Sequence, residues 1–271
     1  MGKKILVVDN DRLMLEFMTD LFKEQGHEVV TAEDGLSALE ILKNYIPDVA
    51  FIDLVMPNIR GDRLCRIIRR MPHLKKVYIV IVSATAVEEP THFAGLGADA
   101  SIAKGPFNEM SKRLLDVLEQ TGTEISKHLG EMLLGSQGVY QRRVTKELLN
   151  AERHLETILN NISEGILELN SDGKIIFCNT MAFSLLGVSE EKLLGLNFIE
   201  LFDGSDRKKI ENLLVKIGDG PPEISDRFSV KHHEKWIALN LLPVEDHMGW
   251  SVIVIVTPPA RDCDTSVVNS H

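Results

Sequence analysis

Cysteine is scarce in this chain of 271 residues, and its three cysteines are far apart. They are Cys65, Cys178 and Cys263, and no C-x-x-C spacing occurs among them. A disulfide framework or a zinc site needs cysteines that are paired more closely. We therefore expect reduced thiols and neither kind of site.

Long apolar runs and an excess of positive charge are missing as well. No apolar run reaches the roughly 18 residues that a membrane helix requires, and the start MGKKILVVDND turns acidic too early for a signal peptide. The 30 basic and 40 acidic residues give a formal charge of −10. Because an acidic field repels nucleic-acid phosphates, we expect no binding to nucleic acid. The missing membrane helix and signal peptide lead us to expect a cytoplasmic protein that does not bind membranes.

The composition predicts two globular domains. Hydrophobic residues make up 44% and charged residues 26% of the chain, which is typical of a protein with ordinary buried cores. From changes in residue pattern we expect a first domain at 1–121, a helical linker at 122–151, a second domain at 152–258 and a disordered tail at 259–271.

Short apolar runs alternate with helical patterns in the first domain. The runs have four to six residues rich in Val and Ile, as expected of strands buried on both faces: Ile5–Val8, Glu28–Thr31, Val49–Ile52, Val77–Val82 and Ala100–Ala103. An amphipathic helix is expected at Leu13–Lys23. Five strands separated by helices predict an α/β fold with an open, doubly wound parallel sheet.

Polar residues stand at the ends of four of these strands. They are, in chain order, Asp9, Asn10, Asp11, Asp53, Ser83 and Lys104. Because the carboxyl ends of parallel strands meet at one edge of the sheet, and ligands of such sheets bind there, we expect these side chains to converge.

This set of side chains suits phosphoryl transfer to a carboxylate. Such transfer needs a nucleophile, a divalent cation and donors for the phosphoryl oxygens. Asp53 suits the first role, because its strand leads directly into a loop, and Asp9 with its neighbour Asn10 offers oxygen ligands for the cation. Ser83 can donate a hydrogen bond and Lys104 can supply a compact positive charge.

Residues 1–121 resemble the receiver domain of two-component response regulators, which has a flavodoxin-like fold. The resemblance lies in ILVVDND, FIDLVMPNIRG, VIVSA and the lysine before Pro106. It implies that Asp53 is the phosphoacceptor, that Ser83 takes the place of the switch hydroxyl and that Lys104 contacts the phosphate. It also implies Mg²⁺ at this site, with Asp9, Asn10 and Asp53 as its ligands.

Three positions depart from the family pattern. Ser101 replaces the aromatic residue that normally moves with the switch hydroxyl, and Gly105 interrupts the usual Lys-Pro step. Asn10 replaces a second acid, and a unit charge pair 4 Å apart is worth about 4 kcal/mol at an effective dielectric near 20. We therefore expect weakened Mg²⁺ binding unless Asp11 compensates, and a degenerate, phosphorylation-independent receiver remains an alternative.

The linker region carries a heptad pattern. Its apolar positions, spaced by 4, 3, 4, 3 and 4 residues, are Val144, Leu148, Ala151, Leu155, Ile158 and Ile162. Such a seam predicts pairing with a second copy, although it is short for an independent coiled coil. The alternative, an amphipathic helix packed on its own domain, stays open.

The second domain begins with two strands and ends with three. The expected strands are Gly165–Asn170, Lys174–Cys178, Ser225–Lys231, Trp236–Leu242 and Trp250–Thr257, with a long helix at Asp206–Ile217. The pair Asp172-Gly173 indicates a hairpin turn between the first two strands. This order predicts an α+β domain in which helices cover one face of an antiparallel sheet.

Residues 152–258 resemble a PAS domain, through LETILNNISEGILELN, SDGKIIFCN and AFSLLGVSEEKLLGLNFIELF. The resemblance implies sensing or dimerisation, and some members hold haem, flavin or small metabolites. The long helix has no histidine for haem, and Cys178 lies outside a flavin-adduct motif. His232 and His233 are expected in a solvated hairpin turn.

We expect the core of the second domain to be filled by its own side chains, with no PAS ligand assigned. The residues expected there are Phe177, Phe183, Leu185 and Phe198.

Together these features predict a response regulator, not a metabolic enzyme. A partner histidine kinase or phosphotransfer protein phosphorylates Asp53, and the second domain passes the signal to a downstream protein. The alternative of another class is an interaction scaffold in which neither domain undergoes chemistry.

Overall fold

The structure is a computed structural model, and it describes residues 2–83, 96–121, 151, 154–218, 227–233, 235–246 and 249–258. Contacts divide the chain into two units, Met1–His154 and Leu155–His271. The expected linker lies outside the described residues except for residue 151, and the expected tail at 259–271 lies outside them entirely. Among the helices within these ranges, none combines the length and apolar character needed to cross a bilayer.

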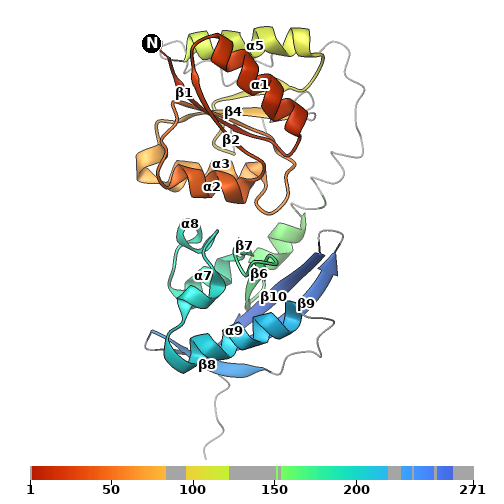
Figure 1. Ribbon diagram of the computed structural model, residues 1–271. Coiled ribbons are helices and arrows are strands. Elements are labelled where there is room, and N and C mark those ends of the chain that lie inside the picture. Colours follow the sequence, from red (N-terminus) through yellow and green to blue (C-terminus); the bar gives the residue numbers. More distant parts are fainter. Residues whose placement is uncertain are drawn as a thin grey trace, which may run out of the picture. The chain divides into compact units, whose positions relative to one another are not determined.

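The first unit contains the predicted parallel sheet, and the doubly wound α/β fold is confirmed (Figure 1). Its strands are β1 (Lys4–Val8), β2 (Glu28–Ala32), β3 (Val49–Ile52), β4 (Tyr78–Ser83) and β5 (Ala100–Ala103). They are ordered β2-β1-β3-β4-β5, with every pair parallel. The winding direction changes between β1 and β3, so the loops that follow these two strands diverge and leave a crevice at their carboxyl ends.

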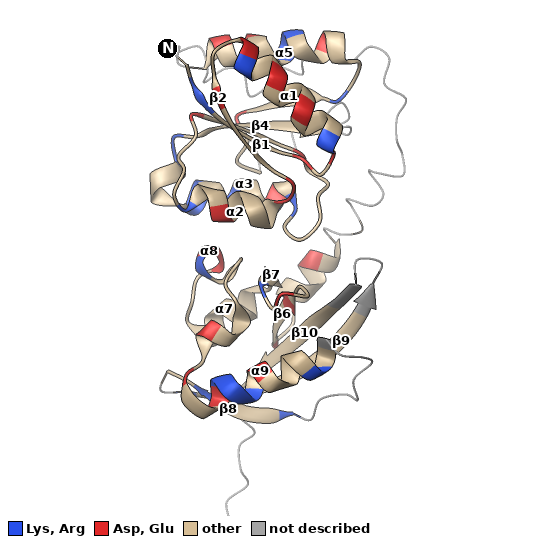
Figure 2. Cartoon of the chain, viewed as in Figure 1, with Lys and Arg blue, Asp and Glu red and all other residues tan. Residues whose placement is uncertain are grey.

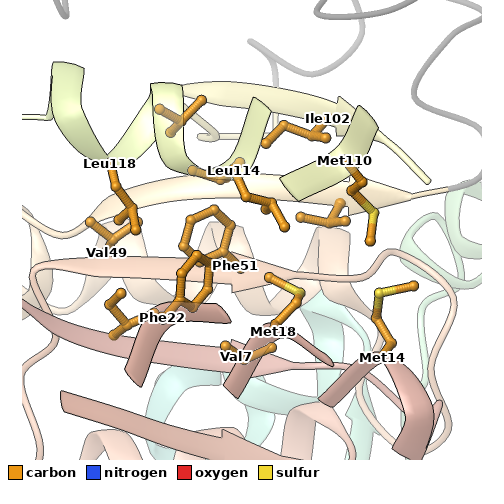
Figure 3. Packing of buried hydrophobic residues seen from close by; sticks show 14 of the residues in the cluster. Val7, Met14, Met18, Phe22, Val49, Phe51, Ile102, Met110, Leu114 and Leu118 are labelled. Atoms are coloured by element: carbon orange, nitrogen blue, oxygen red, sulfur yellow. The ribbon is translucent and has the colours of Figure 1, made fainter. Parts of the chain in front are cut away.

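Helices cover both faces of this sheet (Figure 1). The described helices are α1 (Arg12–Glu24), α2 (Gly35–Leu42), α3 (Gly61–Arg70), the short η1 (Pro72–Leu74) and α5 (Phe107–Gln120). Helices α1 and α5 lie on one face, and α2 and α3 lie on the other. Under α1 and α5, the rings of Phe22 and Phe51 stack with centroids 4.9 Å apart (Figure 3). Apolar burial on both faces explains why the strands carry continuous rather than alternating apolar residues.

The second unit contains an antiparallel sheet with helices on one side, and the predicted α+β fold is confirmed (Figure 1). The strands are β6 (Gly165–Leu169), β7 (Ile175–Cys178), β8 (Phe228–His232), β9 (Lys235–Asp246) and β10 (Gly249–Thr257), in the order β7-β6-β10-β9-β8. Its helices include α7 (Thr180–Leu186), α8 (Glu190–Leu193), η4 (Phe198–Leu201) and α9 (Gly204–Gly218). Along β6, Leu167 and Leu169 are buried while Ile166 and Glu168 are only partly buried, as expected for a sheet with one covered face.

The predicted core of the second unit is correct only for Phe198, which is fully buried. Phe177, Phe183 and Leu185 are only partly buried. Phe177 pairs with Glu168 across β6 and β7, and directly paired residues share a face, so this ring shares the face that carries a charged residue. Among the side chains that are buried in this unit are Ala182, Leu186, Leu193, Phe202 and Ile210.

The predicted solvated turn is wrong for His232, whose exposed fraction is 4%. It is the last residue of β8, so the turn begins one residue later, at His233, which has a positive φ of 52°. The ring nitrogens of His232 lie 2.8 Å from the Leu201 carbonyl oxygen and 2.9 Å from the Leu186 carbonyl oxygen. These contacts join the ends of η4 and α7 to β8.

The heptad seam is only partly described. Residues 154–160 are helical, and Leu155 and Ile158 are exposed on them. Ile162 follows the end of this helix, so the regular seam stops before it. Val144 and Leu148 lie outside the described residues, and both interpretations of the seam stay predictions.

Candidate functional site

A buried charged cluster lies at the carboxyl ends of β1 and β3. Charged residues of the first unit are otherwise found mainly on helices and in loops, and its strands are mostly uncharged (Figure 2). Asp9 and Asp53 directly follow β1 and β3, and their exposed fractions are only 2% and 6%. The Asp53 amide donates to the Val8 carbonyl oxygen at 2.9 Å, so the β1–β3 hydrogen bonding continues to Asp53. The two carboxylates therefore occupy neighbouring strand ends at the crevice.

Lys104 reaches both carboxylates from the end of β5. Its Nζ lies 2.8 Å from an Oδ2 of Asp9 and 2.8 Å from an Oδ2 of Asp53, and the lysine side chain is 19% exposed. The Lys104 amide donates to the Ser83 carbonyl oxygen at 3.1 Å, so the β4–β5 pairing fixes the main-chain position from which the lysine side chain extends. The structure thus brings together Asp9, Asp53 and Lys104, three of the residues predicted from the sequence.

The charges in this cluster influence one another strongly. Burial raises the pKa of Asp9, and the Asp53 charge adds to the rise, while Lys104 opposes it. Burial by itself would lower the pKa of Lys104, but Asp53 and Asp9 outweigh it and raise that pKa. The lysine is therefore held as a cation. When both carboxylates are ionised, the three groups carry one excess negative charge.

Main-chain amides orient both carboxylates. Asp9 Oδ1 accepts from the Asp11 amide at 3.0 Å, and Asp53 Oδ1 accepts from the Leu54 amide at 2.7 Å. The Asp11 carboxylate in turn caps α1 by accepting from the Leu13 amide at 3.0 Å. Asp11 therefore serves helix α1 with one of its oxygens, and Asn10 beside it is exposed.

The donor set fits a weakly held divalent cation. Within the described ranges, no group of three or more His, Cys, Asp or Glu side chains is arranged to hold a metal. Asp9 and Asp53 nevertheless already hold one cationic group, the Lys104 ammonium, between their oxygens. Mg²⁺ is commonly bound by one or two carboxylates together with waters and phosphate oxygens. Asp9 and Asp53 meet that requirement, whereas an all-protein cage is not built here.

The remaining predicted positions lie on β4, β5 and the start of the next loop. Ser83 is buried at the end of β4, opposite Ala103, and residues 84–95 after it lie outside the described ranges. Ser101 is partly buried on β5. A Cβ at Gly105 would meet no atom within 4 Å, so nothing in the surrounding structure requires glycine there.

The loop from Asp53 to Gly61 contains contacts that the sequence analysis missed. A Cβ at Gly61 would lie 1.9 Å from the Asp53 carbonyl oxygen, so only glycine fits against the main chain of Asp53. Asn58 adopts a positive φ of 58° and donates from its amide to Asp34. The signal for these contacts is the Pro57-Asn58 turn, because asparagine tolerates the left-handed region.

Apolar side chains are exposed at the starts of α1 and α5. Leu13 is 69% exposed and Phe107 is 49% exposed, and the Phe107 ring stacks on Phe17 with centroids 4.5 Å apart. Leu13 lies on the helix that follows Asp9, and Phe107 begins the helix that follows Lys104. Two exposed apolar groups therefore flank the segments that carry the charged cluster.

The second unit has a pocket of about 680 Å³ at the end of β8 and the start of α9. Its lining combines charged side chains such as Lys192, Asp206 and Lys231 with the apolar Leu196 and Leu201. Ligand sites are usually lined mainly by apolar and aromatic side chains. This pocket therefore assigns no ligand to the second unit.

Comparison with known families agrees with this geometry. The response regulator receiver domain matches residues 5–115, and the PAS fold matches residues 153–258. The chain is 28% identical over 157 residues to response regulator MprA of Mycobacterium ulcerans, which is 57% of this chain and 67% of that protein. It is 30% identical over 136 residues to the alkaline phosphatase synthesis transcriptional regulatory protein PhoP of Bacillus subtilis, which is 49% of this chain and 54% of the relative.

A solved structure of similar sequence covers less than half of the chain. The chemotaxis response regulator CheY4 of Vibrio cholerae is 26% identical, and the match covers 45% of this chain and 99% of that structure with a TM-score of 0.41.

Proposed function

Residues 5–115 of this chain are a response regulator receiver domain and residues 153–258 are a PAS domain, and from this premise we propose that the chain accepts a phosphoryl group on Asp53 in two-component signalling. The observation that carries the proposal is the buried contact of Lys104 Nζ with Asp53 and Asp9 at 2.8 Å each. A nucleophilic carboxylate and a fixed cation lie together at the crevice of the sheet.

The transfer uses this arrangement directly. An oxygen of Asp53 attacks the phosphorus of a phosphohistidine on the partner; the O–P bond forms, the N–P bond breaks, and its electron pair returns to the ring nitrogen. Lys104 neutralises negative charge on the phosphoryl oxygens. Asp9 and Asp53, with Asn10 beside them, would hold Mg²⁺, and the ion would supply further positive charge for the phosphoryl oxygens.

The partner is a histidine kinase or phosphotransfer protein whose phosphohistidine must reach the crevice. The exposed Leu13 and Phe107 support docking of an apolar helix face beside the cluster, because both lie on elements that start at it. The PAS domain passes the signal to a downstream protein. The chain is then a cytoplasmic switch rather than a metabolic enzyme, and DNA is not its target.

The proposal is tested by loading the receiver from a small donor. Full-length protein is incubated with acetyl phosphate and millimolar Mg²⁺, and phosphorylation is read by intact mass and by mapping the modified peptide. Wild-type protein takes up one phosphoryl group, and Asp53→Asn takes up none. The matched control, Asp20→Asn, changes an exposed carboxylate on α1 and keeps the wild-type labelling. Label that persists in the Asp53→Asn protein places the acceptor elsewhere.

A phosphorylation-independent interaction scaffold is the second candidate. It is favoured by the exposed Asn10 and by the Asp11 carboxylate that caps α1, because neither adds a buried negative charge for a divalent cation. Absence of labelling in the wild-type protein at millimolar Mg²⁺ would support the scaffold.

A further inference from the structure

The side chains of Asn58 and Asp34 connect the loop that follows Asp53 to helix α2. Asp34 is the N-cap of α2, and its Oδ1 accepts from the Ser37 amide at 2.7 Å and also from the Ser37 hydroxyl. Its other oxygen, Oδ2, accepts from the Asn58 side-chain amide. One carboxylate therefore caps a helix and holds the acceptor loop at the same time.

The backbone beside this pair is closely fitted. A Cβ at Gly35 would lie 2.1 Å from the Ile59 carbonyl oxygen, so the loop rests directly on the first residue of α2. Asn58 itself stands in the left-handed region, with φ of 58°. Because few residues with a Cβ adopt this conformation at low cost, the asparagine meets a backbone requirement as well as providing the donor.

The same loop returns to the acceptor. The Gly61 amide donates to the Leu54 carbonyl oxygen at 3.2 Å, and the Gly61 Cα lies against the Asp53 carbonyl group. The segment is thus closed at its base, on Asp53 and Leu54, and held near its tip by Asn58. Because the loop is short and held at both places, a movement of Asn58 should also move the main chain of Asp53.

We propose that Asn58 is a positioning residue for phosphorylation, which acts through its hydrogen bond to Asp34 to hold the Asp53 loop in the geometry that accepts the phosphoryl group. This inference rests on the proposed function of Asp53. The pair is solvent-exposed, unlike the Lys104 cluster, so it opens at modest cost and sets how often the loop is correctly placed.

The test separates the hydrogen bond from the backbone conformation. Asn58→Gly keeps the positive φ and removes the donor, and Asp34→Ser keeps a capping residue for α2 and removes the acceptor of Asn58. Each variant is labelled with acetyl phosphate under saturating Mg²⁺, and the rate of uptake and the loss of label after donor removal are followed. Both variants are expected to take up label about threefold to tenfold more slowly, as loss of one hydrogen bond predicts.

Three comparisons make the result decisive. The double variant Asn58→Gly with Asp34→Ser should be no slower than the slower single variant, because both changes break the same bond. Asn44→Gly, an exposed asparagine in the turn after α2, is the matched control and keeps the wild-type rate. Thermal unfolding of each variant shows whether the protein is folded at the labelling temperature.

The outcomes distinguish this inference from the proposed function. If wild-type protein takes up no label, the proposed function fails. If wild-type protein is labelled and folded Asn58→Gly is labelled at the same rate, the positioning role of Asn58 is overturned. Additive slowing in the double variant would also overturn it, because the two residues would then act separately.

Discussion

The two units bury polar side chains in different ways. In the first unit, Asp9 and Asp53 are paired with the ammonium of Lys104. In the described part of the second unit, the buried polar residues are Asn179, His232 and Ser251, none of which is an Asp, Glu, Lys or Arg. Opposite charges interact strongly in a buried setting, so the phosphoryl group that we propose for Asp53 would add negative charge to a cluster that is already charged.

Asn179 is a buried polar residue of the second unit that carries no charge. Its Oδ1 accepts from the amides of Ile166 and Ala182, both at 2.9 Å, and its Nδ2 donates to the carbonyl oxygens of Leu159 and Glu164 at 2.8 and 2.9 Å. Every hydrogen bond that an amide side chain can readily make is made to the main chain. The side chain thus joins β6, the start of α7 and the helical residues before β6 without adding a charge.

The largest effect is expected from removing the lysine of the charged cluster. Lys104→Met keeps a similar length but leaves Asp9 and Asp53 buried without their cation. Breaking a buried pair in this way costs about 3–5 kcal/mol, so the free energy of unfolding of the first unit should fall by that amount at neutral pH. Urea unfolding followed by circular dichroism measures it. The matched control, Lys112→Met, removes an exposed lysine on α5 and should change stability by less than about 0.5 kcal/mol.

The pH dependence of this variant gives a second readout. The pKa of Lys104 is raised from 10.5 in the folded protein, so its stabilisation is present below that value and is lost as pH rises through the raised pKa. The pKa of Asp9 is raised from 3.8, so ionisation of Asp9 costs stability as pH rises through its raised pKa. The deficit of Lys104→Met should therefore shrink as the pH is lowered from about 7 to about 4. A deficit that does not change with pH would show that lost packing, not charge, is responsible.

The next largest effect is expected from Asn179→Ala. The change removes the cap of α7 and leaves buried main-chain groups without partners, which together cost about 2–3 kcal/mol. Unlike the Lys104 variant, this one should lose the same free energy of unfolding at about pH 5 and about pH 7, because Asn179 carries no charge. Thermal unfolding at both values measures it, with Asn212→Ala, exposed on α9, as control. A strong pH dependence would break the contrast between the two units.

The charged cluster could be predicted from sequence because each of its members stands at a strand end. Continuous apolar runs located β1, β3 and β5, and the topology of a parallel sheet then places Asp9, Asp53 and Lys104 at one edge. The contacts of His232 could not be predicted in this way. Its partners, Leu186 and Leu201, are 46 and 31 positions away in the sequence, and a local sequence pattern does not predict such a contact.

The pairing of Asn58 with Asp34 was partly accessible from the sequence. The Pro57-Asn58 step indicates a turn, and Asp34-Gly35 before an apolar run indicates a helix cap. The contact between the turn and the helix cap could not be predicted, because it depends on how the β3–α3 loop lies on α2. Local chemistry is readable from sequence, whereas contacts between loops require the assembled sheet.

A smaller effect is expected from restoring an acid at position 10. Asn10 is exposed, so a carboxylate there acts through water, where a unit charge pair at 4 Å is worth about 1 kcal/mol. Asn10→Asp should therefore tighten Mg²⁺ binding about fivefold, as measured by isothermal titration calorimetry. Asn44→Asp adds the same charge away from the site and should leave the affinity unchanged. An unaltered titration for Asn10→Asp would place residue 10 outside the ligand shell of the metal.

The smallest effect is expected at Gly105, although it interrupts a sequence step that the receiver family usually keeps. A Cβ there meets no atom within 4 Å, and Gly105 is not among the residues with positive φ, so alanine fits without strain. Gly105→Ala should change stability by at most about 0.5–1 kcal/mol, in the stabilising direction, because it restricts the unfolded chain. Its acetyl-phosphate labelling rate should equal that of the wild type, since Lys104 is fixed by its own hydrogen bonds to Asp9 and Asp53. A labelling rate that changes in this variant would mean that the freedom of the Lys104–Pro106 step, and not the buried charge cluster alone, governs the reaction.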